Sequence, residues 1–188
     1  MIPTELRTAR LLLRPWRAAD AAQLHPILAA NQSHLHGWIA AHVSALAPVD
    51  VLAERLARFA GDFSAGREFR FAVFDAMDAR LLGEADLFVR DERGRVPLGH
   101  GESVELGYWL DATATGRGIA TEATTALIAV AERLPMIRQL EIRCDVRNVR
   151  SAAIPARLGF SVVAAPMTEL QVWRRPVPRA PHHASTVT

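Results

Sequence analysis

Apolar and polar positions along the chain follow two periodicities, and each periodicity predicts a different kind of secondary structure. Period-two or continuous apolar runs are typical of strands. Spacings of three and four indicate helices with one buried face. The strand-like runs cover residues 7–14, 69–73, 81–89, 104–110, 139–146, 160–164 and 168–173. The helical segments cover residues 21–28, 31–47 with a break near Gly37, 52–63, 120–134 and 151–158.

The residues between these runs predict where elements begin and end. Asp20 and Asp50 are expected to cap the helices that follow them, because aspartate is a favoured N-cap residue. Gly159 is a typical C-cap glycine after the last helix. Residues 90–101 carry several charges, glycines and a proline, which predicts an exposed loop. We expect one domain over residues 1–175 and a disordered tail over 176–188.

A glycine-containing loop stands between the strand 104–110 and the helix that starts near Ala120. Its sequence is Thr115-Gly116-Arg117-Gly118-Ile119-Ala120-Thr121. Free backbone N–H groups and the positive end of the helix dipole make such a junction an anion site. Thr121 replaces the third glycine of a dinucleotide fingerprint, and no Gly-Lys-Ser/Thr end follows. A plain turn before a core helix remains the alternative.

Composition and charge exclude several classes of protein. The formal net charge of the 188 residues is +2, which does not indicate nucleic-acid binding. All 22 basic residues are arginine, so no lysine can act as base, nucleophile or phosphate ligand. The single cysteine, Cys144, excludes an internal disulfide and indicates a reducing cytoplasm. No apolar run approaches the roughly 18 residues of a membrane span.

Two longer motifs frame the glycine loop. The first is Glu105-Leu106-Gly107-Tyr108-Trp109-Leu110-Asp111, which runs into the loop. The second is Asn148-Val149-Arg150-Ser151 with the later Arg157-Leu158-Gly159-Phe160. With these motifs and its order of elements, the chain resembles the GCN5-related N-acetyltransferases (GNAT) over about residues 4–175. The opening Arg10-Leu11-Leu12-Leu13-Arg14-Pro15-Trp16 further resembles the branch that acetylates the N-termini of ribosomal proteins.

The resemblance implies an α/β fold of GNAT type. Its mixed sheet has six or seven mostly antiparallel strands flanked by helices, with a V-shaped parting between the strands of Leu110 and Cys144. The implied co-substrate is acetyl-CoA, without a metal. The Leu110 N–H would serve as oxyanion donor, and Asn148 would bind the pantetheine arm. The implied phosphate cradle consists of Thr115, Gly116, Arg117, Gly118, Ile119, Ala120 and Thr121.

Two positions depart from the family pattern. Thr115 stands where the acetyl-CoA motif usually begins with Gln or Arg, which removes a side-chain contact and leaves the backbone cradle. Arg117 is the candidate for supplying charge to the phosphates instead. Pro155 stands where many members carry a tyrosine proton donor, and proline has no hydroxyl.

Acetyl transfer to an amine requires removal of a proton from nitrogen and stabilisation of the departing thiolate. We expect Glu105 to be the base, since a carboxylate between apolar neighbours should have a raised pKa. Glu84 and Asp86 on a neighbouring strand are rivals, and an ordinary exposed glutamate is the plain alternative for Glu105. Ser151 is the candidate for protonating the thiolate, directly or through water; a serine is also common at a helix start.

The remaining candidate residues have ordinary interpretations beside functional ones. His34, His36 and His42 lack the cysteine or carboxylate spacing of a metal site. We expect them, with Trp38, to line or flank the acceptor groove. The pair Tyr108 and Trp109 could form a wall of the acceptor site or simply pack. Cys144 alternates with apolar residues, which favours a core position over a nucleophile.

The predicted function is acetyl-CoA-dependent N-acetyltransfer by direct attack of an amine on the thioester. The acceptor is a peptide or protein N-terminus, or a small-molecule amine. An α-amine costs under ~1 kcal/mol to deprotonate at pH 7.5, against about 4 kcal/mol for a lysine amine. The alternatives are an acyl-CoA-binding module whose catalysis has lapsed and a nucleotide binder that uses the same loop. We expect neither nucleic acid nor a membrane as a partner. The sequence is compatible with a monomer and with a homodimer.

Overall fold

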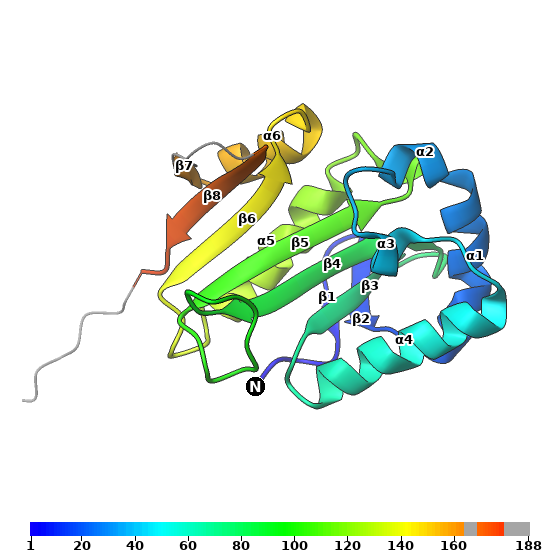
Figure 1. The fold of residues 1–188 in the computed structure, drawn as a ribbon, viewed down its shortest axis with the longest axis horizontal. Coiled ribbons are helices and arrows are strands. Elements are labelled where there is room, and N and C mark those ends of the chain that lie inside the picture. Colours follow the sequence, from blue (N-terminus) through cyan, green and yellow to red (C-terminus); the bar gives the residue numbers. More distant parts are fainter. Residues whose placement is uncertain (164–168, 179–188) are drawn as a thin grey trace, which may run out of the picture.

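An eight-stranded sheet forms the centre of the protein (Figure 1). The computed structural model describes residues 1–163 and 169–178. The order of strands across the sheet is β1-β2-β3-β4-β5-β6-β8-β7, with β5 and β6 parallel and the other neighbours antiparallel. The strands are β1 (Leu6–Arg7), β2 (Leu11–Pro15), β3 (Phe69–Asp75), β4 (Leu81–Arg90), β5 (Ser103–Leu110), β6 (Gln139–Asp145), β7 (Ser161–Val163) and β8 (Leu170–Pro176).

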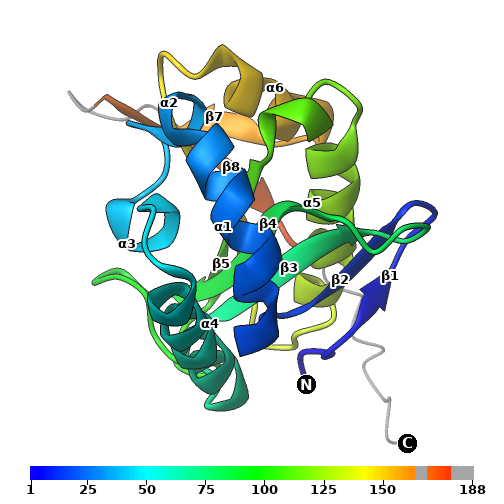
Figure 2. The same cartoon turned by 90° about the vertical axis from the view of Figure 1, so that its right-hand side faces the viewer.

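Helices cover both faces of this sheet (Figure 2). The first four lie on one face and α5 lies on the other, while α6 follows β6 at the end where β5 and β6 separate. Two short 3-10 turns, Ala18–Asp20 and Ala112–Ala114, precede α1 and the glycine loop. The helices are α1 (Ala21–Ala30), α2 (Gln32–Leu35), α3 (Ala41–Ser44), α4 (Val49–Ser64), α5 (Ile119–Ala131) and α6 (Val149–Arg157).

Alternation along the strands divides the apolar core into two layers. On β3, Phe71 and Val73 pack into the layer that contains α5. Ala72 and Phe74 point the other way, into the layer formed with α1 and α4. All four side chains are buried, as expected for a strand covered on both faces.

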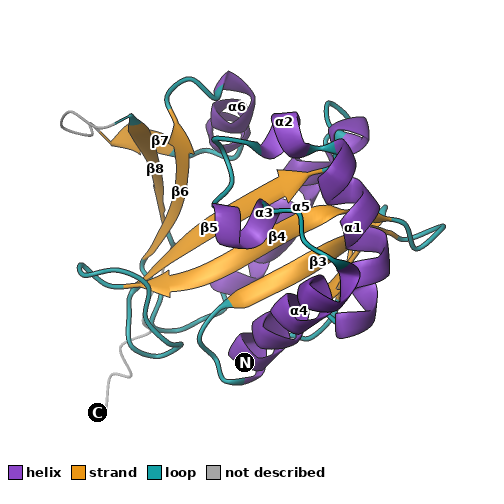
Figure 3. Ribbon diagram, turned by 45° about the vertical axis from the view of Figure 1, so that its right-hand side comes forward, coloured by secondary structure: helices purple, strands orange, loops and turns teal. Residues whose placement is uncertain are grey.

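The parting of β5 from β6 positions the site (Figure 3). Residue pairs join the two strands from Ser103↔Gln139 to Leu106↔Ile142, and the pairing stops there. Beyond this point β5 continues along β4, whereas β6 continues along β8. The predicted V-shaped parting between the strands of Leu110 and Cys144 is therefore confirmed.

The predicted elements match the structure, with three differences. The sheet has an eighth strand, β1, because Leu6–Arg7 folds back on β2 through a turn closed by the Thr8 N–H and the Leu11 carbonyl, 3.0 Å apart. A strand of two residues shows no alternation and so leaves no pattern in the sequence. Asp20 is the N-cap residue of α1, as predicted, but its side chain makes no capping hydrogen bond, whereas the predicted cap at Asp50 is wrong. The Asp20 carboxylate binds the Arg14 guanidinium at 2.7 and 2.8 Å, and Asp50 lies inside the first turn of α4, after Pro48.

Parts of three predictions fall outside the described residues. Ala164 and Thr168, the near ends of the last two predicted strands, are among them. The predicted tail begins at Pro176, which is the last residue of β8, and residues 179–188 also lie outside. Over 1–163 and 169–178, no helix is both long and apolar enough to cross a membrane.

Candidate functional site

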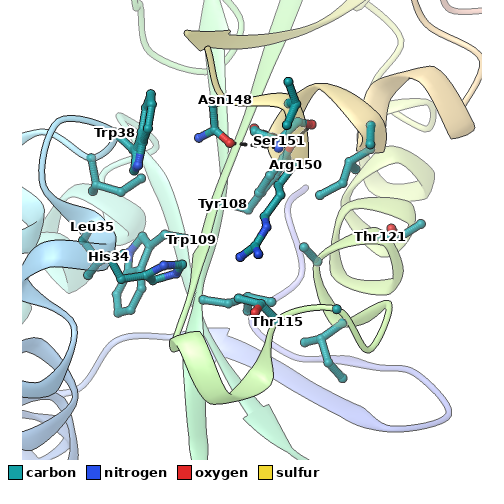
Figure 4. Close-up of a pocket in the computed structure, with 18 of the residues that line it drawn as sticks. His34, Leu35, Trp38, Tyr108, Trp109, Thr115, Thr121, Asn148, Arg150 and Ser151 are labelled. Atoms are coloured by element: carbon teal, nitrogen blue, oxygen red, sulfur yellow. Dashed lines mark hydrogen bonds between the residues drawn. The ribbon is translucent and has the colours of Figure 1, made fainter. Parts of the chain in front are cut away.

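A cavity of about 760 Å³ opens where β5 and β6 separate (Figure 4). Four parts of the chain line it: α2 with the residues after it, the end of β5, the glycine loop with the first turn of α5, and α6 with the residues before it. The residues that line it include His34, Trp38, Tyr108, Trp109, Leu110, Thr115, Gly116, Gly118, Ile119, Ala120, Thr121, Arg147, Asn148, Arg150, Ser151 and Arg157.

The glycine loop presents backbone N–H groups to this cavity. Gly116 and Gly118 have φ angles of 73° and 76°, a left-handed conformation that other residues rarely adopt. The first intrahelical bond of α5 joins the Glu122 N–H to the Gly118 carbonyl at 3.0 Å. The N–H groups of the three residues between them therefore have no partner within the helix. The loop has the geometry of an anion cradle.

The Thr115 side chain does not extend the cradle. Its hydroxyl donates to the Ala112 carbonyl at 2.8 Å, which uses its one hydrogen within the turn. The Arg117 side chain is exposed and is not among the residues that line the cavity. The structure therefore does not bring the Arg117 guanidinium to the place where the sequence analysis expected it.

Leu110 directs a backbone donor into the parting. The Asp111 N–H donates to the Leu82 carbonyl of β4 at 2.8 Å. Because successive N–H groups of a strand point to opposite sides, the Leu110 N–H points away from β4, toward the side where β6 has separated. This group has the direction that an oxyanion donor would need.

Asn148 and Ser151 meet at the start of α6. The Asn148 side-chain oxygen accepts the Ser151 N–H at 3.0 Å, so Asn148 caps α6. Asn148 also lines the cavity, and its amide nitrogen stays available to a ligand. The Ser151 hydroxyl lies 3.1 Å from the Tyr108 hydroxyl, which also donates to the Ser151 carbonyl at 3.0 Å. Burial raises the pKa of Tyr108 above its ordinary value of 10.0.

Two arginines of α6 face the cavity without an ion-pair partner among residues 1–163 and 169–178. These are Arg150 and Arg157. The Arg150 guanidinium extends into the cavity toward Thr115 (Figure 4). A third arginine, Arg147, is already paired with Asp145 at 2.7 Å and lies over the Trp38 ring at 5.8 Å. Arg150 and Arg157 both stand in the motifs quoted above, but no role was predicted for them, although their spacing of seven places them on one helix face.

Glu105 lies away from the cavity. Its carboxylate binds Arg90 at 2.7 Å and Arg95 at 2.8 Å, and Arg143 lies within 3.8 Å. Three guanidinium groups surround it in place of the apolar neighbours on which its prediction as the base depended. The structure therefore gives Glu105 an ion-pairing role, and the alternation of β5 did not reveal these partners because they come from three other segments.

The rival carboxylates Glu84 and Asp86 are also enclosed on β4. The Glu84 carboxylate is 1% exposed and accepts hydrogen bonds from the indole N–H groups of Trp16 at 2.6 Å and Trp109 at 3.3 Å. Arg70 is 3.2 Å from it. Since Trp109 lines the cavity, Glu84 acts on the site by holding that ring in place.

Asp86 makes the stability of the fold depend on pH. Burial first, and then the charge of Glu84, raise the pKa of Asp86 well above 3.8, although Arg70 and Arg95 oppose the shift. The neutral carboxyl therefore favours the folded state. Its contribution is complete below the unfolded-state pKa and is lost as the pH rises through the folded-state pKa.

Asp86→Asn should remove most of this pH dependence, because the amide imitates the neutral carboxyl. We expect the melting temperature of the variant to exceed that of the parent by a few degrees at the alkaline end of a pH series. Thermal unfolding from acid to alkaline pH measures it. Asp50→Asn, at an exposed position, is the control and should leave the curve unchanged. Parallel curves for Asp86→Asn and the parent would contradict the assignment.

The wall opposite α5 is largely apolar and aromatic. His34 and Trp38 line it together with Trp109. His36 and His42 do not line the cavity. Cys144 is buried and free, which confirms its predicted core position. No carboxylate occurs among the described residues that line the cavity, so a bound amine meets no fixed negative charge there.

Comparison with known proteins identifies the family. The model of the acetyltransferase (GNAT) domain matches residues 10–161. The [ribosomal protein uS5]-alanine N-acetyltransferase of Escherichia coli is 28% identical over 155 residues, which are 82% of this chain and 77% of that protein. The probable N-acetyltransferase YjcK of Bacillus subtilis is 23% identical over 155 residues, 82% of each chain.

A solved structure supports the same fold. RimL, a ribosomal L7/L12 alpha-N-protein acetyltransferase solved with coenzyme A, superimposes with a TM-score of 0.74 at 19% identity, over 94% of this chain and 97% of that chain. The family model covers most of the domain, and the sheet with its parting agrees with it. This chain therefore belongs to the GNAT acetyltransferases and is an N-acetyltransferase.

Proposed function

We propose that the chain transfers the acetyl group of acetyl-CoA to the α-amine of a peptide or protein N-terminus. One observation carries the proposal: a single cavity joins the amide cradle of α5 to the Leu110 N–H at the parting of β5 and β6. The relatives that acetylate ribosomal proteins support the choice of an N-terminal acceptor.

The cofactor would bind along the side of the cavity formed by α5 and α6. Backbone amides from Gly116 to Thr121 would bind the pyrophosphate, each charge-assisted bond contributing roughly 1.5–3 kcal/mol. Arg150 would add the cation that Thr115 does not provide, since its guanidinium has no ion-pair partner among the described residues and points into the cavity. Asn148 would bind an amide of the pantetheine arm.

Arg10 holds the cradle in shape from outside the cavity. Its guanidinium donates to the Arg117 carbonyl at 2.9 Å and to the Glu122 carboxylate at 2.7 Å. The Arg10 backbone N–H donates to the same carboxylate at 3.0 Å, and Thr8 donates to it as well. These bonds connect the residues just before β2 with the loop and with the first turn of α5.

Arg10→Ala should weaken acetyl-CoA binding about tenfold, because the loop backbone loses the group that orients it. Isothermal titration with acetyl-CoA measures the dissociation constant. Arg7→Ala removes a similar exposed side chain whose ion pair is with the neighbouring Glu5, and it should leave binding unchanged. An unchanged dissociation constant for Arg10→Ala would show that the loop keeps its shape without this contact.

The acceptor would enter between α2 and the end of β5. No carboxylate of the described residues lines the cavity, and an α-amine needs under ~1 kcal/mol to lose its proton at pH 7.5. His34 is the imidazole that lines this wall, and histidine is the commonest general base. We therefore assign proton removal to His34 or water, in place of Glu105.

The transfer follows from this placement. The amine nitrogen attacks the thioester carbon, and the Leu110 N–H stabilises the negative charge on the carbonyl oxygen. The C–S bond then breaks and its electron pair stays on sulfur. The Ser151 hydroxyl donates a hydrogen bond to the departing sulfur, and the thiolate takes its proton from water on this side of the cavity. The proton lost by the amine passes to His34 or to water.

The test combines binding with turnover. We would measure thermal unfolding with acetyl-CoA, ATP and NAD, and then acetylation of peptides that begin with Ala or Ser. Ligand at 100 times its dissociation constant adds about 2.7 kcal/mol of stability, a shift of several degrees. We expect a shift with acetyl-CoA alone, and acetylation of free but not of N-terminally blocked peptides, read by mass spectrometry.

The other outcomes discriminate the alternatives. A thermal shift with no peptide or small-amine product would favour an acyl-CoA-binding module without catalysis, for which Pro155 in α6 is the supporting feature. A shift with ATP or NAD and none with acetyl-CoA would favour a nucleotide binder. Product from a small amine alone would move the acceptor from proteins to metabolites.

A further inference from the structure

Tyr108 is the one tyrosine of the chain. Its hydroxyl contacts the hydroxyl of Ser151, the residue to which we assign hydrogen bonding to the leaving sulfur. It extends from β5 into the cavity, while Ser151 lies on the first turn of α6 across the parting. The two hydroxyl oxygens are 3.1 Å apart. The Tyr108 hydroxyl also lies 3.0 Å from the Ser151 carbonyl.

Two arrangements of hydrogens link the Tyr108 and Ser151 hydroxyl groups directly. The carbonyl can only accept, so a Tyr108 hydroxyl that donates to it can pair with the Ser151 hydroxyl only as the acceptor. If Tyr108 instead donates to the Ser151 hydroxyl oxygen, the Ser151 hydrogen is free to turn toward the cavity or toward the neighbouring Cys144 thiol. In the second arrangement the Ser151 hydroxyl can donate while its oxygen accepts from Tyr108. Hydrogen bonds linked in such a chain strengthen one another.

We propose that Tyr108 is the positioning residue of the leaving-group donor, and that it replaces the tyrosine that Pro155 excludes from α6. When charge develops on sulfur, the Tyr108 hydroxyl turns from the Ser151 carbonyl to the Ser151 hydroxyl oxygen. The Ser151 hydrogen then turns to the sulfur. This assignment rests on the proposed acetyl-transfer function.

Electrons and protons balance without ionisation of the tyrosine. The electron pair of the C–S bond stays on sulfur, and two neutral hydroxyl groups stabilise the resulting thiolate by hydrogen bonds. The thiolate then takes a proton from water, which is restored by the proton that the amine released. Burial keeps the pKa of Tyr108 above its ordinary value, so the hydroxyl keeps its hydrogen throughout.

A double-mutant cycle tests the assignment. Tyr108→Phe removes the hydroxyl and keeps the ring, and Ser151→Ala removes the donor and keeps the carbonyl. We expect each variant to lower kcat about tenfold with KM for acetyl-CoA within twofold, and the double variant to lose no more than either one. Thr124→Val, which removes a buried hydroxyl that has no hydrogen-bond partner among the described residues, is the control and should keep kcat.

Multiplying losses in the double variant, or a loss in KM alone, would show that Tyr108 only supports the wall of the cavity and would overturn the assignment. Unchanged kcat in Tyr108→Phe would do so too. If the parent protein itself acetylates neither peptides nor small amines, that result contradicts the proposed function. It is distinct from the results of the mutant cycle, which contradict only the role of Tyr108.

A spectroscopic arm needs no acceptor. Tyrosine labelled with carbon-13 at the phenol carbon gives one resonance, since the chain has one tyrosine. Saturation with CoA should move this resonance in the parent protein, because the Ser151 hydrogen turns to the thiol. The movement should be mostly lost in Ser151→Ala. Equal movement in both proteins would contradict the proposed link through the serine hydroxyl.

Discussion

Gly83→Ala is expected to lower the free energy of unfolding by about 3 kcal/mol and to abolish activity. Gly83 lies on β4 opposite Leu110, with a φ angle of 152°. A Cβ atom there would stand 2.1 Å from the Trp109 carbonyl oxygen and 2.8 Å from the Leu110 Cα. Both are backbone atoms of β5, so the strand itself must move.

Activity is expected to be lost because the movement of β5 displaces Leu110. Leu110 carries the N–H assigned to the oxyanion, and a displacement of about 1 Å is enough to cost a large factor in rate. Thermal unfolding should show a fall of roughly 6–12 °C. Gly61→Ala is the matched control, because Gly61 lies within α4 with open space around its Cα. That variant should be slightly more stable than the parent.

A stable and fully active Gly83→Ala protein would contradict the close approach of β4 to β5. A stable protein without activity would separate the two effects and leave the oxyanion assignment intact. A destabilised protein that still turns over at the parent rate would remove Leu110 from the mechanism.

Gly118→Val is expected to raise the dissociation constant of acetyl-CoA about 100-fold, which corresponds to about 2.7 kcal/mol. Gly118 is the N-cap of α5 with a φ angle of 76°, a conformation that a β-branched residue does not adopt without strain. A change of φ turns the amides of Ile119 and Ala120 away from the cavity. The loss of one or two charge-assisted hydrogen bonds accounts for the expected size.

The control separates loss of affinity from loss of stability. Gly99 has a φ angle of 94° and open space around its Cα, and it lies in the loop between β4 and β5. Gly99→Val should carry similar backbone strain and keep its affinity for acetyl-CoA. Isothermal titration at a temperature where both variants are folded makes the comparison. Equal affinity in Gly118→Val and the parent would return the glycine loop to a plain turn.

Local patterns predicted the parts of the site that depend on neighbouring residues. The two glycines, the apolar helix after them and the strand before them all lie within about thirty residues, and their order determines the anion cradle. The cap made by Asn148 on α6 is also a local contact. These features could be predicted because each needs only the chain on either side of it.

Contacts between distant segments could not be predicted in this way. Glu105 was interpreted from the alternation of its own strand, but its partners Arg90, Arg95 and Arg143 come from β4, a loop and β6. Tyr108 and Ser151 are 43 positions apart. The family resemblance supplied the parting of the sheet, but not which hydroxyl groups face each other across it.

The junction between β5 and β6 gives bound cofactor a mechanical role. Four residue pairs join the strands β1–β5 to the group β6, β8 and β7, and the two groups then diverge. Acetyl-CoA placed as proposed would contact α5 on one side of the divergence and α6 on the other. Bound acetyl-CoA would therefore hold the two groups of strands together, and the free energy needed to separate them would rise with cofactor occupancy. The C-terminal strands would then be the first to open when the cofactor leaves, before the rest of the domain unfolds.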